Sequence, residues 1–417
     1  MSPRKTSETP RAPSSPEGVL EGRKILLIVT GGVAAYKAAT LARLFVRAGA
    51  KVRTALTDAA THFIAPLTFE ALTGERALAS LWDRGLPEIA HISWSEWADL
   101  LVVAPASADF MAQAASGEAG NFALATLLAS PGKALFAPAM NSRMLSNPAT
   151  QANILRLREQ GHRVMSSGTG ALACGDTGQG RMPEPGEILF HAARALSPPR
   201  LAYKRLLISG GSTLEPWDSI RFMANRSSGL MGVELAHAAW LMGAQAELVL
   251  GPMAVEPRIK DMDLQVHRVG STMDMLDALQ TRLKDKDALF MAAAPADFRP
   301  KEVVGGKIGK DSARLTLPLA RNPDILMELS KGKDKAILVG FAANPAESLL
   351  KGALEKLQRK NLDYIVANPA TGESSSFASP DTTFKLIKKG GRVALSGTGS
   401  KFSAAWSILV TVLGHKP

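Results

Sequence analysis

Runs of apolar residues alternate with amphipathic stretches along most of this chain, a pattern typical of proteins that combine parallel strands with helices. Residues 24–32, KILLIVTGG, form an apolar run that ends in two glycines, and the helical pattern of residues 34–50 follows. A second apolar run occupies residues 51–57. This order predicts a strand, a glycine turn, a helix and a second strand, with backbone N–H groups presented where the helix begins.

A second unit of the same kind begins at residues 204–211, KRLLISGG. The polar stretch 212–232 then precedes the next helical pattern, and loops of this length are often functional. Ser197 and two prolines interrupt the preceding helix, so we expect one domain at 23–197 and another at 198–417. We predict an α/β fold of two doubly wound parallel-sheet, Rossmann-like domains, with ligands at the carboxyl ends of the strands. Neither glycine pair matches the dinucleotide fingerprint.

Residues 1–22 are rich in Pro, Ser and Thr and lack an apolar run, so we expect a disordered tail without a secretory signal. No later stretch approaches about 18 uninterrupted apolar residues, and we expect no membrane span. Cys174 is the only cysteine, so an internal disulfide is excluded. These features together favour a cytoplasmic protein.

The net charge of +11 is concentrated near the C-terminus. Residues 297–417 contain 19 Lys or Arg and 11 Asp or Glu, which gives this segment +8. A nucleic-acid partner is not indicated, because there is no Arg-rich arm and only 6% of the residues are aromatic. A small polyanionic ligand explains the local excess better.

Four stretches of the first half combine polar and glycine residues in a pattern that suggests chemistry. They are GGVAAYK, EIAHISWSEWAD, APAMNSRM and ACGDTGQGRMPEP. Most follow apolar runs, so we expect them at one crevice beside the strand ends. Each residue alone has a plain structural interpretation, since a lone Cys or His is usually a packed residue. Their joint occurrence favours a site, and no histidine spacing suggests zinc.

From about residue 23 to 195, the sequence resembles the flavin-dependent cysteine decarboxylases that act on phosphopantothenoylcysteine. The resemblance implies FMN and decarboxylation of an N-acylated cysteine, which needs an electron sink because direct loss of CO2 would leave an unstabilised carbanion. It further implies that His91 is a base, that Asn141 holds the substrate carboxylate and that Cys174 donates a proton, beneath a flap formed by RMPEPGE. The implied FMN contacts are Gly31, Gly32, Thr57, Ser107 and Ala139.

The second half has a different set of polar stretches. FMANRSSG precedes a helix, AAAPADFRP follows an apolar run, and GGKIGK places lysines in a glycine-rich loop. KLQRK puts two lysines on one helical face, which is more often a solvated arrangement. Together with the local charge excess, these stretches favour a triphosphate pocket.

Residues 203–410 resemble the phosphopantothenate-cysteine ligases, which are fused to the decarboxylases in many bacteria. The resemblance implies CTP activation of 4'-phosphopantothenate to an acyl-cytidylate, with Mg2+ whose ligands the sequence does not assign. Asn225 would contact the intermediate, Asp297 the nucleotide and Lys307 the phosphates, with Lys310 as a helper. The remaining implied nucleotide contacts are Asn322, Pro323, Asp324, Ile325, Phe341, Lys356 and Lys360.

The chain departs from these families at four positions: Asp109, Gly120, Gly309 and Asn344. The resemblance predicts a bifunctional enzyme of coenzyme A biosynthesis that binds small-molecule substrates. It also implies a homo-oligomer with trimeric decarboxylase contacts and dimeric ligase contacts. Two alternatives stay open at this point, a flavin decarboxylase acting on peptidyl cysteine and a non-catalytic flavoprotein that regulates a partner.

Overall fold

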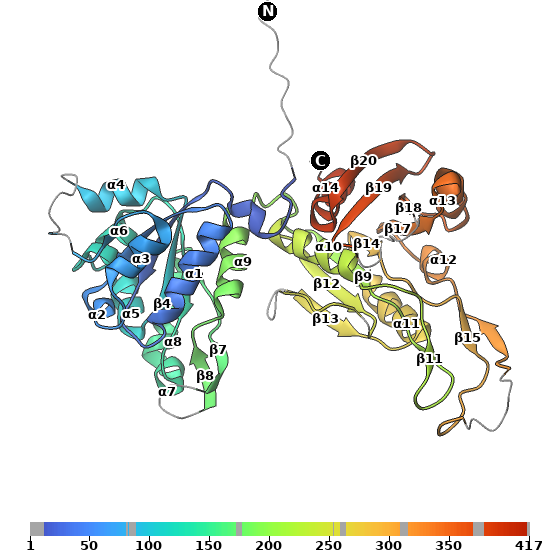
Figure 1. Ribbon diagram of the computed structural model, residues 1–417, viewed down its shortest axis with the longest axis horizontal. Coiled ribbons are helices and arrows are strands. Elements are labelled where there is room, and N and C mark those ends of the chain that lie inside the picture. Colours follow the sequence, from blue (N-terminus) through green and yellow to red (C-terminus); the bar gives the residue numbers. More distant parts are fainter. Residues whose placement is uncertain are drawn as a thin grey trace, which may run out of the picture. The chain divides into compact units, whose positions relative to one another are not determined.

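The computed structural model describes residues 12–80, 82, 89–171, 177–252, 254–258, 264–308, 316–369 and 379–414. The chain forms two compact units (Figure 1). The N-terminal unit is residues 17–197, and the C-terminal unit is residues 1–16 together with 198–417.

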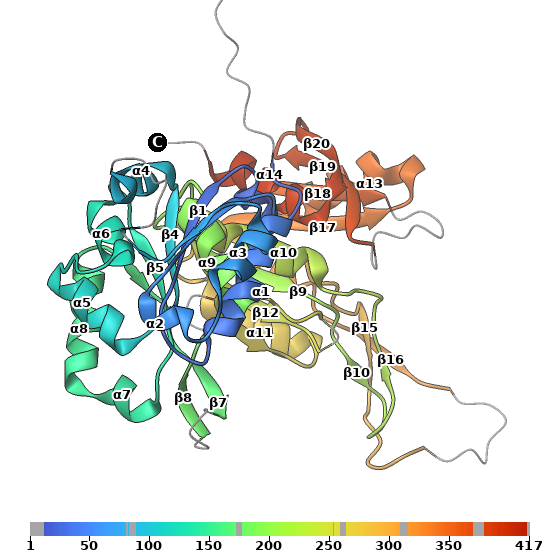
Figure 2. The same cartoon turned by 60° about the vertical axis from the view of Figure 1, so that its left-hand side comes forward.

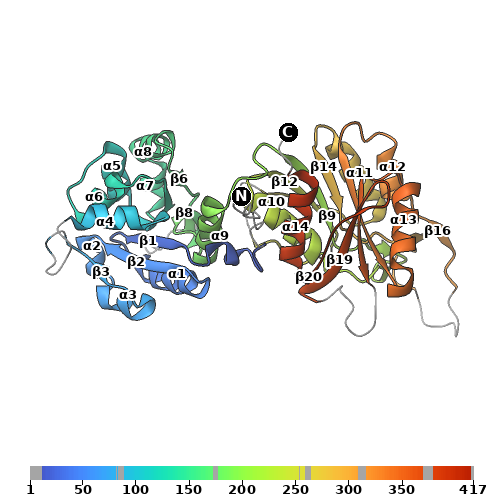
Figure 3. The same ribbon diagram turned by 90° about the horizontal axis from the view of Figure 1, so that it is seen from above.

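The N-terminal unit is built on a six-stranded sheet with helices on both faces (Figure 3). The strands of this sheet are β1 (Lys24–Val29), β2 (Lys51–Leu56), β3 (Ala77–Leu78), β4 (Leu100–Ala106), β5 (Ala134–Pro138) and β6 (Arg163–Val164). The hairpin strands are β7 (Gly168–Ala171) and β8 (Thr177–Arg181). The helices are η1 (Glu17–Leu20), α1 (Ala35–Arg47), α2 (Asp58–Thr61), α3 (Pro66–Thr73), α4 (Ala90–Trp97), α5 (Ala108–Ser116), α6 (Phe122–Ala129), α7 (Ser142–Ser146), α8 (Pro148–Glu159) and α9 (Pro185–Leu196).

All neighbouring strands of this sheet are parallel, in the order β3-β2-β1-β4-β5-β6. Helices α1, α3 and α9 cover one face, and α4, α5, α6 and α8 cover the other (Figure 3). Because both faces are covered, β1 and β4 are apolar along most of their length instead of alternating. The predicted doubly wound parallel sheet is confirmed, and the strand order reverses between β1 and β4.

The segment before β1 corrects the expectation of a disordered tail that extends to residue 22. Residues 17–20 form η1, which packs against α9, and Leu20 is fully buried. Gly22 N donates to Gly49 O at 2.9 Å, which fixes the entry into β1. Burial of the Leu20 side chain favours the ordered form of this short stretch, while residues 1–11 lie outside the described residues.

The C-terminal unit is built on an eight-stranded sheet. Its strands are β9 (Arg205–Gly210), β12 (Gln245–Leu250), β13 (Leu264–Arg268), β14 (Ala288–Met291), β17 (Ile337–Asn344), β18 (Tyr364–Pro369), β19 (Asp381–Lys388) and β20 (Val393–Ser400). Two small hairpins pair β10 (Glu215–Pro216) with β11 (Phe222–Met223) and β15 (Phe298–Pro300) with β16 (Leu319–Arg321). The helices are α10 (Leu230–Leu241), α11 (Thr272–Leu283), α12 (Ile325–Ser330), η2 (Ala346–Ser348), α13 (Leu349–Arg359) and α14 (Lys401–Leu413).

The strand order in the C-terminal unit is β13-β12-β9-β14-β17-β18-β19-β20. The first six strands are parallel, as predicted, whereas β19 and β20 add an antiparallel edge that the sequence patterns did not indicate. Helices α10 and α14 pack on one face of this sheet, and α11, α12 and α13 pack on the other. Because α14 covers α10, the latter helix is apolar on nearly all sides.

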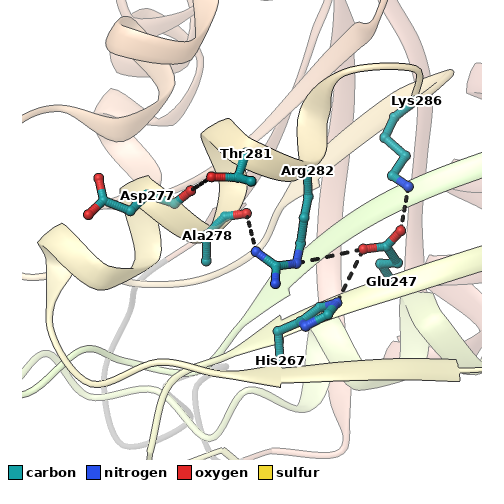
Figure 4. Close-up of polar contacts among 7 residues, drawn as sticks. All are labelled: Glu247, His267, Asp277, Ala278, Thr281, Arg282 and Lys286. Carbon is teal, nitrogen blue, oxygen red and sulfur yellow. Dashed lines mark hydrogen bonds and ion pairs between the residues drawn. The ribbon is translucent and has the colours of Figure 1, made fainter.

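A cluster of charges on β12, β13 and α11 ties this helix to its end of the sheet (Figure 4). Glu247 accepts from Lys286 Nζ, lies 3.2 Å from His267 Nε2 and forms a longer ion pair with Arg282. Burial would raise the pKa of Glu247, but Lys286 and His267 outweigh it and hold this pKa below the usual range. The charged Glu247 carboxylate therefore stabilises the folded protein at pH values above the ordinary pKa of a glutamate. This stabilisation is lost as pH falls through the lowered pKa of Glu247.

Candidate functional site

The predicted flavin contacts of the N-terminal unit lie at the carboxyl ends of four adjacent strands. Gly31 and Gly32 follow β1, Thr57 follows β2, Ser107 follows β4 and Ala139 follows β5. The sheet order places β2, β1, β4 and β5 side by side. The structure therefore brings these five residues to one edge of the sheet.

Close packing shapes this edge. Thr30 Oγ1 donates to Pro105 O at 2.8 Å and accepts from Ser107 N at 3.0 Å, so the turn after β1 is bonded to the end of β4. A Cβ at Gly31 would lie 2.6 Å from the Cβ of Ala59, so a side chain at this position would clash with α2. A Cβ at Gly32 would meet no atom within 4 Å, which leaves open space beside the turn.

The donor groups at this edge fit a phosphorylated flavin. Thr57 Oγ1 accepts from Ala60 N at 3.3 Å, and Ser107 Oγ accepts from Phe110 N at 3.2 Å. Each hydroxyl caps a helix as an acceptor, so its own hydrogen stays available to a ligand. Hydroxyl donors beside helix N-termini and an uncovered glycine suit a phosphate and a polyhydroxy chain.

Asn141 lies beside the hairpin of β7 and β8, whose strands flank the segment that contains Cys174. Met140 N donates to Gly180 O at 2.9 Å, and Ser142 Oγ donates to Gln179 O at 2.6 Å. These two bonds hold β8 against the turn that carries Asn141. Cys174 itself lies outside the described residues, so its predicted proximity to Asn141 stays a prediction.

Gly180→Ala is expected to disrupt this contact. Gly180 has a φ of +137°, and an added Cβ would lie 2.2 Å from Met140 O. Overpacking of this kind costs about 1–3 kcal/mol, so we expect β8 to shift and decarboxylation to fall at least about 10-fold. Gly186→Ala in α9 is the matched control, because its Cβ would meet no atom within 4 Å. Equal decarboxylation rates of the two variants would show that the hairpin contact is not needed.

The segment RMPEPGE, which we expected to form a flap over the substrate, is packed against its own unit, and its place over a substrate stays a prediction. Met182 is buried, and Pro185 begins α9. Glu184 caps α9 in a reciprocal pair with Glu187, and its carboxylate lies 2.8 Å from Lys37 Nζ. Capping and the ion pair with α1 fix this segment in place, which its Pro- and Gly-rich composition did not reveal.

His91 is the predicted site residue that the structure keeps apart from the others. It is the second residue of α4, whose Ser95 Oγ bonds to Ile92 O and Ala129 O near the end of α6. Figures 1 and 2 both show α4 at the opposite end of the N-terminal unit from α7 and the β7–β8 hairpin. A single chain therefore does not bring His91 to Asn141.

The C-terminal unit contains a cavity of about 940 Å³ at the ends of β14, β17 and β18. Nearly all the predicted ligase residues line it, although they come from five separate segments of the chain. They are Asn225, Asp297, Asn322, Pro323, Asp324, Ile325, Phe341, Lys356 and Lys360.

Hydrogen bonds position the polar groups of this cavity. Asn225 Nδ2 donates to Pro295 O at 2.8 Å, and Asn322 Nδ2 donates to Ala296 O at 2.9 Å. The same loop is fixed from behind, because Ala296 N donates to the buried Thr213 Oγ1 at 3.0 Å. The loop after β14 is thus hydrogen-bonded both to the segment that contains Asn225 and to the segment that contains Asn322.

Lys356 of α13 and Lys360, which directly follows this helix, add positive charge to the cavity. Lys360 Nζ forms a 2.9 Å ion pair with Asp324, while Lys356 Nζ donates to Asn344 Oδ1 at 3.1 Å. Burial, followed by the charges of Lys360 and Arg359, lowers the pKa of Lys356. Asn344 is a neutral partner, so the charge of Lys356 is left for an anionic ligand.

Lys307 is not among the residues that line the cavity. It is exposed, on a loop that Asp218 anchors by accepting from Ile308 N at 3.2 Å and from Ile220 N and Arg221 N at 2.8 and 2.7 Å. Burial would raise the pKa of Asp218, but these backbone donors and the Arg221 guanidinium lower it. Gly309 and Lys310 lie outside the described residues, and the role of Lys307 stays a prediction.

Asp218→Asn is expected to loosen the Lys307 loop. An asparagine keeps one acceptor oxygen but loses the negative charge that three backbone donors share. We therefore expect faster hydrogen exchange of the backbone amides at residues 304–308. We also expect a KM for the nucleotide that is about 3- to 10-fold higher. In the natural protein, the protection of these amides from exchange should persist at pH values above the ordinary pKa of an aspartate. It should be lost as pH falls through the lowered pKa of Asp218. The exposed Asp277→Asn is the control, and equal exchange in both variants would contradict the anchoring role.

Sequence reasoning missed several residues of the cavity wall. Arg321, Arg359, Asn368, Thr382 and Lys401 also line it. Asn368 directly follows the apolar run of β18, a signal that could have been used. Lys401 and Thr382 could not have been found this way, because they reach the cavity through the unexpected antiparallel strands β19 and β20.

The part of the chain that the structure describes also bears on metal sites and membrane spans. Within the described ranges, no group of three or more His, Cys, Asp or Glu side chains has an arrangement suited to holding a metal ion. Among the helices that the structure describes, none combines the length and apolar character needed to cross a membrane.

Comparisons with known proteins agree on the nature of both units. Residues 13–196 match the family described as Flavoprotein, and residues 201–415 match the DNA/pantothenate metabolism flavoprotein C-terminal domain. The chain is 37% identical over 396 residues to the coenzyme A biosynthesis bifunctional protein CoaBC of Vibrio parahaemolyticus, covering 94% of this chain and 98% of that protein. The CoaBC protein of Bacillus subtilis is likewise 37% identical over 396 residues, which cover 94% and 97% of the two chains.

Solved structures resemble each half separately. The C-terminal domain of a CoaBC protein is 34% identical, with a TM-score of 0.43, and covers 51% of this chain and 96% of its own. The FMN binding protein AtHal3 is 32% identical, with a TM-score of 0.37, and covers 42% of this chain and 96% of its own. On the strength of the matches along almost the whole sequence, the chain belongs to the family of coenzyme A biosynthesis bifunctional proteins.

Proposed function

We propose that this protein joins 4'-phosphopantothenate to L-cysteine with CTP and then decarboxylates the product to 4'-phosphopantetheine with FMN. The observation that carries the proposal is the arrangement of two different sets of polar residues at the strand ends of two separate units. One set places the hydroxyl groups of Thr57 and Ser107 beside an open glycine turn. The other surrounds a large cavity with lysines, which suits a nucleotide triphosphate.

In the decarboxylase unit, Gly31, Gly32, Thr57, Ser107 and Ala139 would hold FMN. Bound FMN would supply a two-electron acceptor for the cysteinyl thiol before CO2 leaves and the reductant that the decarboxylated product needs afterwards. The Asn141 amide would donate to the departing carboxylate and orient it. The thiol of Cys174 would then give a proton to the sulfur-stabilised carbanion that remains.

The base of this reaction would come from a second subunit. Helix α4, which contains His91, and helix α7, whose N-cap is Asn141, lie at opposite ends of the N-terminal unit, so one chain does not place both residues at one substrate (Figures 1 and 2). We infer a homo-oligomer in which His91 of one copy faces Asn141 of another. Trimeric contacts between decarboxylase units and dimeric contacts between ligase units would meet this requirement.

In the ligase unit, the substrate carboxylate would attack the α-phosphorus of CTP, and pyrophosphate would leave. The amine of cysteine would then attack the acyl carbon of the cytidylate and displace CMP. Residues 322–325 and Phe341 would contact the nucleotide, while Lys356, Lys360 and Lys307 would balance the charge of its phosphates. Mg2+ would offset the charge that develops on the leaving pyrophosphate, and the exposed Asp297 carboxylate, which lines the cavity, is a group that could help to hold it.

The test is an end-point assay of the purified full chain with 4'-phosphopantothenate, L-cysteine, Mg2+ and either CTP or ATP. We expect a yellow protein that forms pyrophosphate, CO2 and 4'-phosphopantetheine with CTP. Supplying 4'-phosphopantothenoyl-L-cysteine directly isolates the decarboxylase step. A flavin-loaded protein that turns over neither substrate would overturn the proposal and favour a binding protein of the same fold.

A further inference from the structure

Lys401 places a buried positive charge in the wall of the ligase cavity. It is the first residue of α14, is only 5% exposed and lines the cavity. Its backbone N–H donates to Pro380 O at 2.8 Å, but among the described residues no partner forms a hydrogen bond or ion pair with its ammonium group. A buried ammonium without a partner is costly, so such a group points to a ligand that completes the charge balance.

The nearby carboxylate of Glu234 does not serve as that partner. Glu234 Oε2 lies 3.2 Å from His237 Nδ1, and Glu234 Oε1 forms a 3.9 Å ion pair with Arg258. Arg258 N donates to His237 Nε2 at 3.1 Å, which leaves the ring hydrogen on Nδ1 to bond Glu234. Both carboxylate oxygens are therefore directed to groups other than Lys401.

Glu234 nevertheless supports the charge of Lys401 from a distance. Burial lowers the pKa of Lys401, and the negative charge of Glu234 opposes this shift. Glu234 therefore offsets part of the cost of burying this charge, while the three N–H donors of Lys401 remain available to a ligand.

Two helices begin at the same part of the cavity and add to its attraction for an anion. Helices α10 and α14 pack together, and Leu230 and Met231 at the start of α10 line the cavity beside Ser227 and Gly229. The first backbone N–H groups of a 12-residue helix favour negative charge at this position. Lys401, which is buried at the start of α14, independently favours an anionic ligand at the same place.

We propose that Lys401 binds a phosphate group of a ligase substrate between the starts of α10 and α14. This inference rests on the proposed function and adds to it a residue from the last helix of the chain. The phosphate has two possible sources, the triphosphate of the nucleotide and the 4'-phosphate of the acid substrate. Both are multiply charged anions that three ammonium N–H donors can bind.

The experiment compares the full-length natural protein with Lys401→Met, Lys401→Arg and Lys388→Met. Methionine has nearly the same length as lysine but no charge, and arginine restores the charge. Lys388→Met is the matched control because Lys388 is an exposed residue of β19 that does not line the cavity. Separate KM values for CTP and for 4'-phosphopantothenate are measured, together with the thermal shift that each substrate alone produces.

We expect Lys401→Met to raise one KM at least about 10-fold and to abolish the thermal shift by that substrate, with partial recovery in Lys401→Arg. The substrate affected identifies the source of the phosphate. Unchanged KM values and thermal shifts for both substrates would overturn the proposal. If Lys401→Met does not fold, Lys401→Gln is judged by the same criterion. An inactive natural protein would instead refute the proposed function, which the Lys401 variants do not test.

Discussion

Asn141→Asp is expected to lower decarboxylation at least about 100-fold without unfolding the N-terminal unit. Asn141 is the N-cap of α7, and its Oδ1 accepts from Arg143 N at 2.8 Å. Aspartate caps helices as well as asparagine does, so the local fold should be retained. The substitution replaces the amide donor by a second carboxylate oxygen, which would repel the carboxylate of the substrate. Capping and substrate binding are thereby separated in one variant.

The measurement is formation of 4'-phosphopantetheine from 4'-phosphopantothenoyl-L-cysteine by the flavin-loaded protein. Asn147→Asp is the matched control, because Asn147 caps α8 by accepting from Ala149 N at 2.9 Å and lies on the same segment of the chain. We expect this control to retain both its flavin absorbance and its activity. Full activity in Asn141→Asp would remove Asn141 from carboxylate binding, and loss of flavin absorbance would assign it to cofactor retention instead.

The strand ends explain why so much of both sites could be predicted. An apolar run followed by a polar or glycine residue indicates a buried parallel strand and its carboxyl end, and such ends meet at one edge. Thr57 and Ser107 are far apart in the sequence but follow β2 and β4, two strands separated only by β1. Asp297 comes after the apolar run of β14 in the same way, whereas Phe341 lies inside β17 and was implied only by the family resemblance.

Three features of the sites follow from packing that local patterns do not encode. The separation of His91 from Asn141 depends on which end of the sheet α4 covers. The rigidity of RMPEPGE depends on the ion pair between Lys37 and Glu184, which are 147 positions apart in the chain. Lys401 reaches the cavity only because β19 and β20 reverse the chain direction.

Lys356→Met is expected to raise the KM for CTP about 10- to 100-fold while leaving decarboxylation unchanged. Its ammonium lies in the cavity wall, and its described hydrogen-bond partner is the neutral Asn344. A triphosphate would therefore lose a charge-assisted contact, which Lys360 does not replace because it is already paired with Asp324. The control is Lys351→Met, an exposed lysine of the same helix. Similar KM values in both variants would contradict the assignment.

The pH dependence of this contact provides a second test. Burial lowers the pKa of Lys356, Lys360 and Arg359 lower it further, and Asp297 and Asp324 oppose the shift. A lowered lysine pKa means that the positive charge is lost at a less alkaline pH than for an exposed lysine, so the affinity for CTP should weaken as pH rises toward this value. Lys356→Arg keeps its charge over the whole range and should remove this part of the pH dependence. A KM profile that is the same in Lys356→Arg and in the natural protein would show that another group controls nucleotide binding.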